Sequence, residues 1–238
     1  MRCAWSAGFL YGLHEQGFQA EELIASSGNV ANAAYFATNQ VENMKRIWTK
    51  HLPGKRFISY SRLNKIIDID YLVDDVLKQR EPIRLDVLKQ CKTKVIFPIR
   101  NVRTGQFKLF TNENVTYDVL RAAKALPIVY GKTVKIDSEY YSDHSITPLE
   151  LVKYADKKAN LIVIDVRSTP FLTFIKNLFW GLENKSLQTT GATDTMIIKP
   201  FIKAHFLSRS QKTLTELFEA GRQASFGYNL PKKGQNAA

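Results

Sequence analysis

Cysteine and histidine are scarce in this chain of 238 residues, which contains two cysteines and four histidines. Cys3 and Cys91 are too few and too far apart in sequence to form a disulfide framework or a zinc-binding set. The sequence has no H-E-x-x-H motif and no glycine-rich phosphate loop. Four aspartates within residues 68–75 are explained by a helix start, where the helix dipole favours negative charge. We therefore predict no metal and no cofactor, and nucleotide binding has little support.

Long hydrophobic runs are also missing. No segment reaches the roughly 18 to 20 apolar residues that a transmembrane helix needs. Residues 1–13 superficially resemble a signal peptide, with an arginine before an apolar run. However, Trp5, Phe9 and Leu13 are spaced as one face of a helix, with Ala and Gly between them. We therefore predict a core helix built for close packing, no signal peptide, and a cytoplasmic or peripheral membrane protein.

Acidic residues are outnumbered by basic ones, 22 to 34, which gives a formal net charge of +12. The basic residues are scattered along the chain, and no arginine-rich arm or nucleic-acid motif accompanies them, so we expect no nucleic-acid partner. A diffuse positive field suits an anionic membrane surface or anionic substrates, or serves solubility alone. The aromatic stretch 171–180 fits core packing or docking at a membrane interface. The oligomeric state stays open.

The composition is that of a globular protein, with 45% apolar and 24% charged residues. We expect one α/β domain over residues 1–226 and a disordered tail over 227–238. Strands that alternate with helices are typical of a mostly parallel sheet with helices on both faces. Residues 161–166, LIVIDV, are apolar on both faces, which predicts a central parallel strand.

The pattern of apolar residues predicts the remaining elements. Helices are expected over residues 4–16, 29–39, 41–51, 68–79, 85–90, 117–126, 149–158, 171–182, 193–206 and 211–223. Strands are expected over residues 23–25, 94–103, 106–110, 133–136 and 140–141, the second and third joined as a hairpin.

The most informative stretch is residues 21–40, EELIASSGNVANAAYFATNQ. A short apolar strand stops at Ser26, Ser27 and Gly28, and a helical pattern follows. A sharp strand-to-helix turn raises a serine hydroxyl clear of the sheet and places it beside a helix N-terminus, where backbone N–H groups favour negative charge. The alternative is that Ser26 or Ser27 simply caps the helix.

A second informative position is Asp143, which follows a short strand in a turn before a helix. A serine nucleophile needs a base, and a carboxylate one hydrogen bond away can serve without a histidine. The alternative is an ordinary turn aspartate. His144, the next residue, is a candidate to tune Asp143.

Together these segments resemble the patatin-like phospholipase family of acyl hydrolases. That family has a G-G-G-x-R-G loop, a G-x-S-x-G nucleophile elbow and a downstream D-G-G or D-G-A turn. Here Arg2 stands at the arginine of the loop and Cys3 at the following glycine. The segment ASSGN places Ser27 as the nucleophile, DHS places Asp143 at the turn, and RAAKALP is similar to the family's R-A-S-x-A-x-P.

The resemblance implies a three-layer α/β/α fold with a mostly parallel central sheet. It also implies hydrolysis of a lipid acyl ester, with Ser27 as nucleophile and Asp143 as base. Backbone N–H groups near Arg2 and Cys3, together with Gly28, would hold the oxyanion.

The chain departs from the family pattern at several positions. Ala25 and Asn29 replace the two glycines of the elbow, and His144 and Ser145 replace those after the aspartate. The first strand and the three leading glycines of the oxyanion loop are absent from this sequence. The alternatives are therefore a chain with a clipped start, or a catalytically impaired member that binds lipid or a partner.

Overall fold

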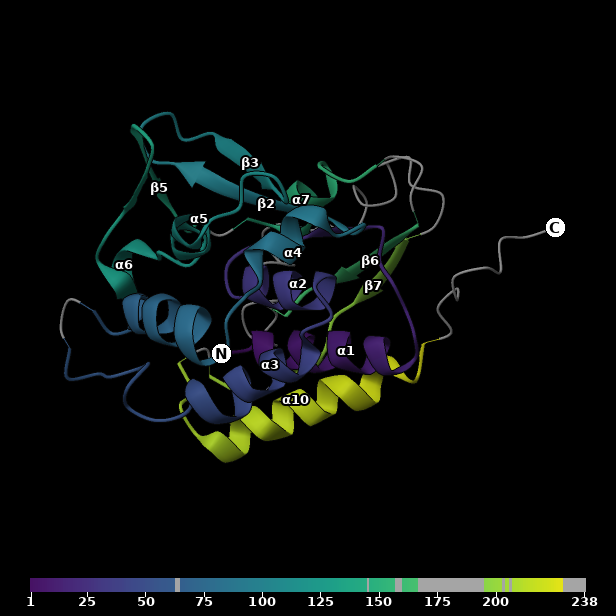
Figure 1. Ribbon diagram of the computed structural model, residues 1–238. Coiled ribbons are helices and arrows are strands. Elements are labelled where there is room, and N and C mark those ends of the chain that lie inside the picture. Colours follow the sequence, from purple (N-terminus) through teal and green to yellow (C-terminus); the bar gives the residue numbers. More distant parts are fainter. Residues whose placement is uncertain are drawn as a thin grey trace, which may run out of the picture.

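The computed structural model describes residues 1–62, 65–144, 146–156, 160–166, 195–202, 204–205 and 207–228. The protein belongs to the α/β class, with helices and a mixed sheet (Figure 1). The first half contains α1 (Cys3–Glu15), β1 (Glu22–Ile24), α2 (Asn29–Ala37), α3 (Val41–Arg46), the π-helical segments η1 (Ile47–His51) and η2 (Tyr71–Arg80), and α4 (Leu85–Gln90).

The second half of the chain holds most of the strands. It contains β2 (Lys94–Asn101), β3 (Phe107–Thr111), α5 (Tyr117–Ala122), α6 (Pro127–Tyr130), β4 (Val134–Ile136), β5 (Glu139–Ser142), α7 (Pro148–Val152), β6 (Leu161–Ile164), β7 (Thr195–Ile198) and α10 (Gln211–Ser225). Most predicted elements are confirmed within a few residues of their expected bounds. The helix expected over 117–126 is shorter, because α5 ends at Ala122 and Pro127 begins α6 instead. The helix expected over 149–158 is also shorter, since α7 ends at Val152.

The main sheet is mixed. β1 pairs in parallel with β2, whereas β2 pairs antiparallel with β3 and β5, and β5 pairs antiparallel with β4. The expected mostly parallel sheet is therefore not found among the described strands. Short connections explain the antiparallel pairs β2–β3 and β4–β5, because strands joined by a hairpin run antiparallel, whereas a parallel pair needs a crossover of a dozen or more residues.

Two predictions near the C-terminal end need correction. β6, expected at the centre of the sheet, is half-buried, and among the described strands it pairs only with β7, in parallel. β7 itself lies where a helix was predicted over residues 193–206. The β-branched Thr195, Ile197 and Ile198 favour a strand, and Pro200 is incompatible with a helix interior. The helix predicted at 171–182, and the predicted tail from residue 229 on, fall outside the described residues.

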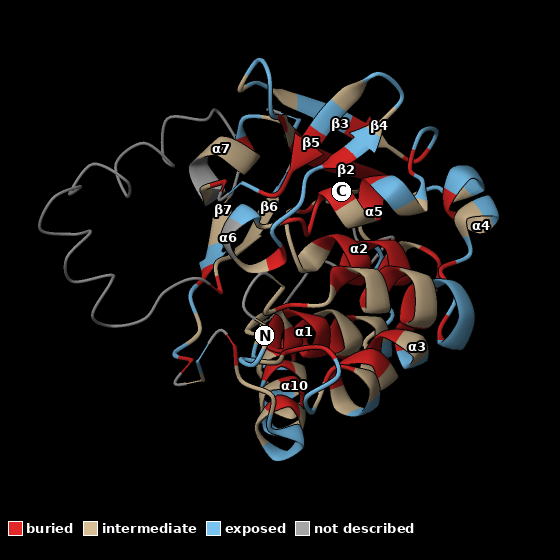
Figure 2. Ribbon diagram, turned by 90° about the vertical axis from the view of Figure 1, so that its left-hand side faces the viewer, coloured by how far each residue is buried: buried red, intermediate tan, exposed pale blue. Residues whose placement is uncertain are grey.

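The N-terminal helix lies at the centre of the helical side of the molecule. In both views α1 lies between α2 and α10 (Figures 1 and 2). Its predicted apolar face is confirmed, since Trp5, Phe9 and Leu13 are all buried. None of the helices within the described ranges combines the length and apolarity that crossing a bilayer requires.

Glycines let the backbones of α1 and α10 come into direct contact. A Cβ atom added to Gly8 would lie 1.8 Å from the Phe218 carbonyl oxygen, and one added to Gly221 would lie 1.9 Å from the Trp5 carbonyl oxygen. Both obstacles are main-chain atoms, which cannot rotate away as a side chain can. Any larger residue at these positions must therefore push the two helices apart.

We expect Gly221→Ala to lower the free energy of unfolding by about 1–3 kcal/mol, because overpacking outweighs the better helix propensity of alanine. The matched control is Gly227→Ala, whose added Cβ would meet no atom nearer than the Ala224 carbonyl oxygen at 3.4 Å. Urea unfolding at constant m-value measures both variants. Equal unfolding midpoints for the two variants would contradict this account of the packing.

Candidate functional site

The structure brings Ser27 and Asp143 together. The Ser27 hydroxyl donates a hydrogen bond of 2.6 Å to Oδ2 of Asp143, across 116 positions in the sequence. β1 runs parallel to β2 and ends opposite Ile96, whereas β5 runs antiparallel and ends opposite Arg100. The residues that follow β1 and β5 therefore approach the middle of β2 from opposite ends, and this convergence joins the two side chains.

Ser27 occupies a sharp corner between β1 and α2. Its φ of 54° lies in the left-handed region, which is uncommon for a residue other than glycine. Such conformations cost free energy and cluster at functional sites. Helix α2 has Gly28 as its N-cap and no side-chain cap. Neither serine side chain caps the helix, so the capping interpretation is wrong, and the Ser27 hydroxyl is instead directed to a carboxylate.

The start of α1 lies against this corner. A Cβ atom on Gly28 would lie 2.9 Å from Sγ of Cys3, so a side chain at position 28 would collide with the first residue of α1. Arg2 is the N-cap of α1, and its Nε donates to the Ala204 carbonyl at 3.4 Å. The N-terminal ends of α1 and α2 thus meet next to Ser27, and both carry partial positive charge.

A polar network joins these two helix starts. Oδ1 of Asn29 accepts hydrogen bonds from the Ser6 hydroxyl at 2.5 Å and from Nδ2 of Asn32 at 3.2 Å. Asn32 also donates to the Cys3 carbonyl at 3.0 Å and accepts from Nε1 of Trp48 at 2.8 Å. Asn29, a departure from the elbow pattern, therefore ties α2 to α1. This network was not predicted from the sequence, although polar residues within otherwise apolar helices are a signal that could have indicated it.

The carboxylate of Asp143 is largely shielded from water. Asp143 is 5% exposed, and its N–H donates to the Ala125 carbonyl at 3.0 Å. Burial raises the pKa of Asp143 to about 6, against the hydrogen bond from Ser27 and the positive charge of Lys124, which both lower it. Burial also raises the pKa of the Cys3 thiol, so we expect a neutral thiol beside a base that is ionised at neutral pH.

His144 contacts an arginine rather than the dyad. It is exposed, and its Nε2 lies 2.5 Å from Nη1 of Arg100. A guanidinium only donates hydrogen bonds, so in this contact Arg100 is the donor. Ser145 lies outside the described residues.

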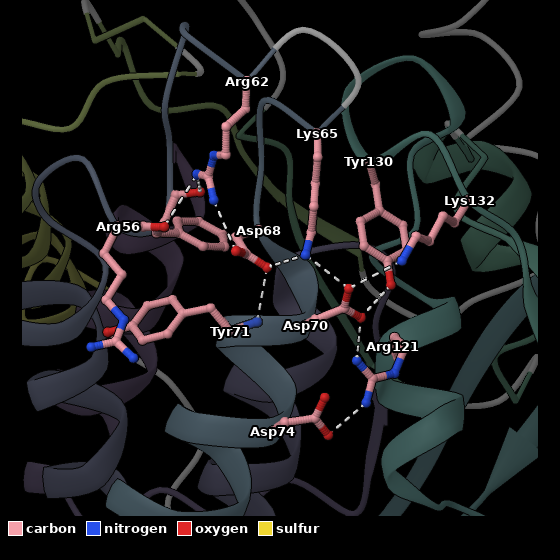
Figure 3. A network of polar contacts seen from close by, with 11 residues as sticks. Arg56, Arg62, Lys65, Asp68, Asp70, Tyr71, Asp74, Arg121, Tyr130 and Lys132 are labelled. Atoms are coloured by element: carbon pink, nitrogen blue, oxygen red, sulfur yellow. Dashed lines mark hydrogen bonds and ion pairs between the residues drawn. The ribbon is translucent and has the colours of Figure 1, made fainter.

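The aspartates before η2 stabilise the fold. Asp68 accepts a hydrogen bond from the Tyr71 N–H at 3.0 Å, as expected of a helix cap. Asp70 receives four partners, which Figure 3 shows converging on it: Lys65, Arg121, Tyr130 and Lys132. Arg121 also pairs with Asp74 at 2.7 Å. This network fastens α5 and α6 to η2.

No group of histidine, cysteine or carboxylate side chains in the described part of the chain is arranged to hold a metal ion. A scan against protein-family models and a search of curated proteins both found no match. The chemistry of the site is therefore inferred from its geometry.

The titration of Asp143 predicts a pH-dependent stability. Its pKa in the fold, about 6, exceeds the ordinary value of 3.8, so the folded state binds the proton more tightly than the unfolded state. Ionised Asp143 thus costs stability above pH 6, and this cost disappears as the pH falls to about 4. We expect the wild type to gain roughly 2 kcal/mol relative to Asp143→Asn between about pH 7 and pH 4. Denaturant unfolding at both pH values measures it, and a pH-independent difference would contradict the burial of a charged Asp143.

Proposed function

We propose that this protein is a patatin-like lipid acyl hydrolase with a Ser27–Asp143 dyad. The observation that carries the proposal is the 2.6 Å hydrogen bond from the Ser27 hydroxyl to the Asp143 carboxylate. Ser27 is the donor in this bond, so its proton already lies on the path to the base. A serine activated by a carboxylate, without a histidine, is a minimal nucleophile and base pair.

The reaction starts when Ser27 Oγ attacks the acyl carbonyl carbon and its proton passes to Asp143. The tetrahedral intermediate collapses as the ester C–O bond breaks, and the proton on Asp143 passes to the departing alcohol. Water then attacks the acyl-serine and Asp143 takes its proton. The bond from the acyl carbon to Ser27 Oγ breaks, Asp143 returns the proton to Oγ, and the acid is released. A base with a pKa of about 6 is ionised at neutral pH and close enough to the working pH to transfer protons in both directions.

We assign stabilisation of the oxyanion, the negatively charged oxygen of the tetrahedral intermediate, to backbone N–H groups near Arg2 and Cys3 and to Gly28. The convergence of the α1 and α2 N-termini beside Ser27 supports this assignment, because both ends favour negative charge. Removal of one such donor typically costs about 100- to 1,000-fold in rate.

The three-layer patatin-like arrangement is part of the same proposal. The order strand, serine corner, helix and the parallel pairing of β1 with β2 fit it. The antiparallel strands β3, β4 and β5 would be additions to that arrangement. We propose lipid esters as substrates, presented at an anionic membrane surface that attracts the net charge of +12.

We expect Ser27→Ala to lower kcat/KM for a short-chain nitrophenyl ester and for phospholipid in anionic vesicles by about 1,000-fold or more. Ser26→Ala is the matched control, because Ser26 lies at the same corner without a role in the proposed reaction. Unchanged turnover in Ser27→Ala would exclude the dyad. Vesicle binding by a wild type that hydrolyses neither substrate would instead identify a lipid-binding module without catalysis.

A further inference from the structure

Lys124 is a buried cation that the reaction described above does not use. It follows α5 and is 6% exposed. Its Nζ donates to the Leu120 carbonyl at 3.4 Å, and within the described residues this ammonium forms no contact ion pair. Removing an ammonium from water costs several kcal/mol unless a charge or hydrogen bonds compensate it. The placement of Lys124 therefore requires an explanation.

The compensating charge lies on Asp143. The Asp143 N–H donates to the carbonyl of Ala125, the residue after Lys124, at 3.0 Å, so the two segments are docked to each other. Burial lowers the pKa of Lys124 to about 8. Asp143 and, to a smaller extent, Cys3 oppose this shift and raise the pKa. Ser27 and Lys124 both lower the pKa of Asp143, and Asp143 in turn raises the pKa of the Cys3 thiol.

On the exposed side, the residue next to Asp143 is His144, which is bonded to Arg100. Among the described residues, Lys124 is thus the buried cation that acts on the carboxylate. It leaves the Ser27–Asp143 hydrogen bond intact, because its ammonium acts from beyond ion-pair contact.

The segment that carries Lys124 is held rigidly. Three residues earlier, Arg121 is fixed by ion pairs of 2.6 Å to Asp70 and 2.7 Å to Asp74 (Figure 3). Tyr130, in the following helix, also binds Asp70. These contacts hold both ends of the turn that contains Lys124 and Ala125 against η2, so Lys124 lies on a fixed support next to the segment that carries Asp143.

We propose that Lys124 is a positioning residue, whose buried charge keeps Asp143 ionised as the base that accepts the Ser27 proton. This inference rests on the proposed hydrolase function. Without the charge of Lys124, the pKa of Asp143 rises further, and a larger fraction of the enzyme carries a protonated, inactive aspartic acid at a given pH.

The test compares Lys124→Met, Lys124→Arg and the control Lys89→Met, which removes the same charge from an exposed position. The pH profile of kcat/KM is measured for each. Lys124→Met should move the midpoint of the acid limb upward by about one pH unit or more. Lys124→Arg should restore it to within about half a unit, and Lys89→Met should leave it in place. A Lys124→Met profile that overlays the wild type would overturn the inference and leave the hydrolase proposal intact.

A second measurement does not depend on activity. The loss of stability caused by Lys124→Met should be larger at about pH 7.5, where Asp143 is ionised, than at about pH 4.5, where it is protonated. If the wild type hydrolyses no ester, the proposed function fails and this difference still decides the charge pairing. An equal loss at both pH values, or a variant unfolded at both, overturns the inference.

Discussion

The hydrogen bond between Ser27 and Asp143 is the interaction on which the site depends, and it requires two distant chain segments to meet in a dry setting. Asp143 is almost fully buried, and its carboxylate receives the Ser27 hydroxyl at 2.6 Å. The sheet makes this contact possible, because β1 and β5 lie along the same edge of β2, opposite β3, and run toward each other. A sheet in which β5 ran parallel to β2 would carry Asp143 away from the serine corner.

Close backbone packing holds the corner in place. Gly8 and Gly221 let α1 lie directly on α10, and Gly28 lets the start of α1 approach the serine corner. The network of Asn29, Ser6 and Asn32 then locks the two helix starts together. Stability and chemistry are opposed here: a left-handed Ser27 and a buried ionised Asp143 both cost free energy, which the packing of the helices must offset.

The sequence was sufficient to predict the local features. Residues 21–40 predicted the strand, corner and helix, and the resemblance placed Ser27 and Asp143 in one site. The sequence did not predict the long-range features of the fold. The antiparallel pairing of β5 with β2 depends on register across the sheet, and β7 was obscured because four apolar and β-branched residues also fit a helix. The burial of Lys124 was not predicted, because a lysine between alanines is typical of a solvated helix position. Only tertiary packing buries this side chain.

The central claim is that Ser27 is a nucleophile activated by Asp143. The most direct measurement is fluorophosphonate labelling of the purified wild type, followed by mass spectrometry of the modified peptide. The account predicts a single adduct on Ser27 that is lost in Asp143→Asn while the fold is retained. An adduct on another residue, equal labelling of Asp143→Asn, or no adduct on the folded wild type would contradict it.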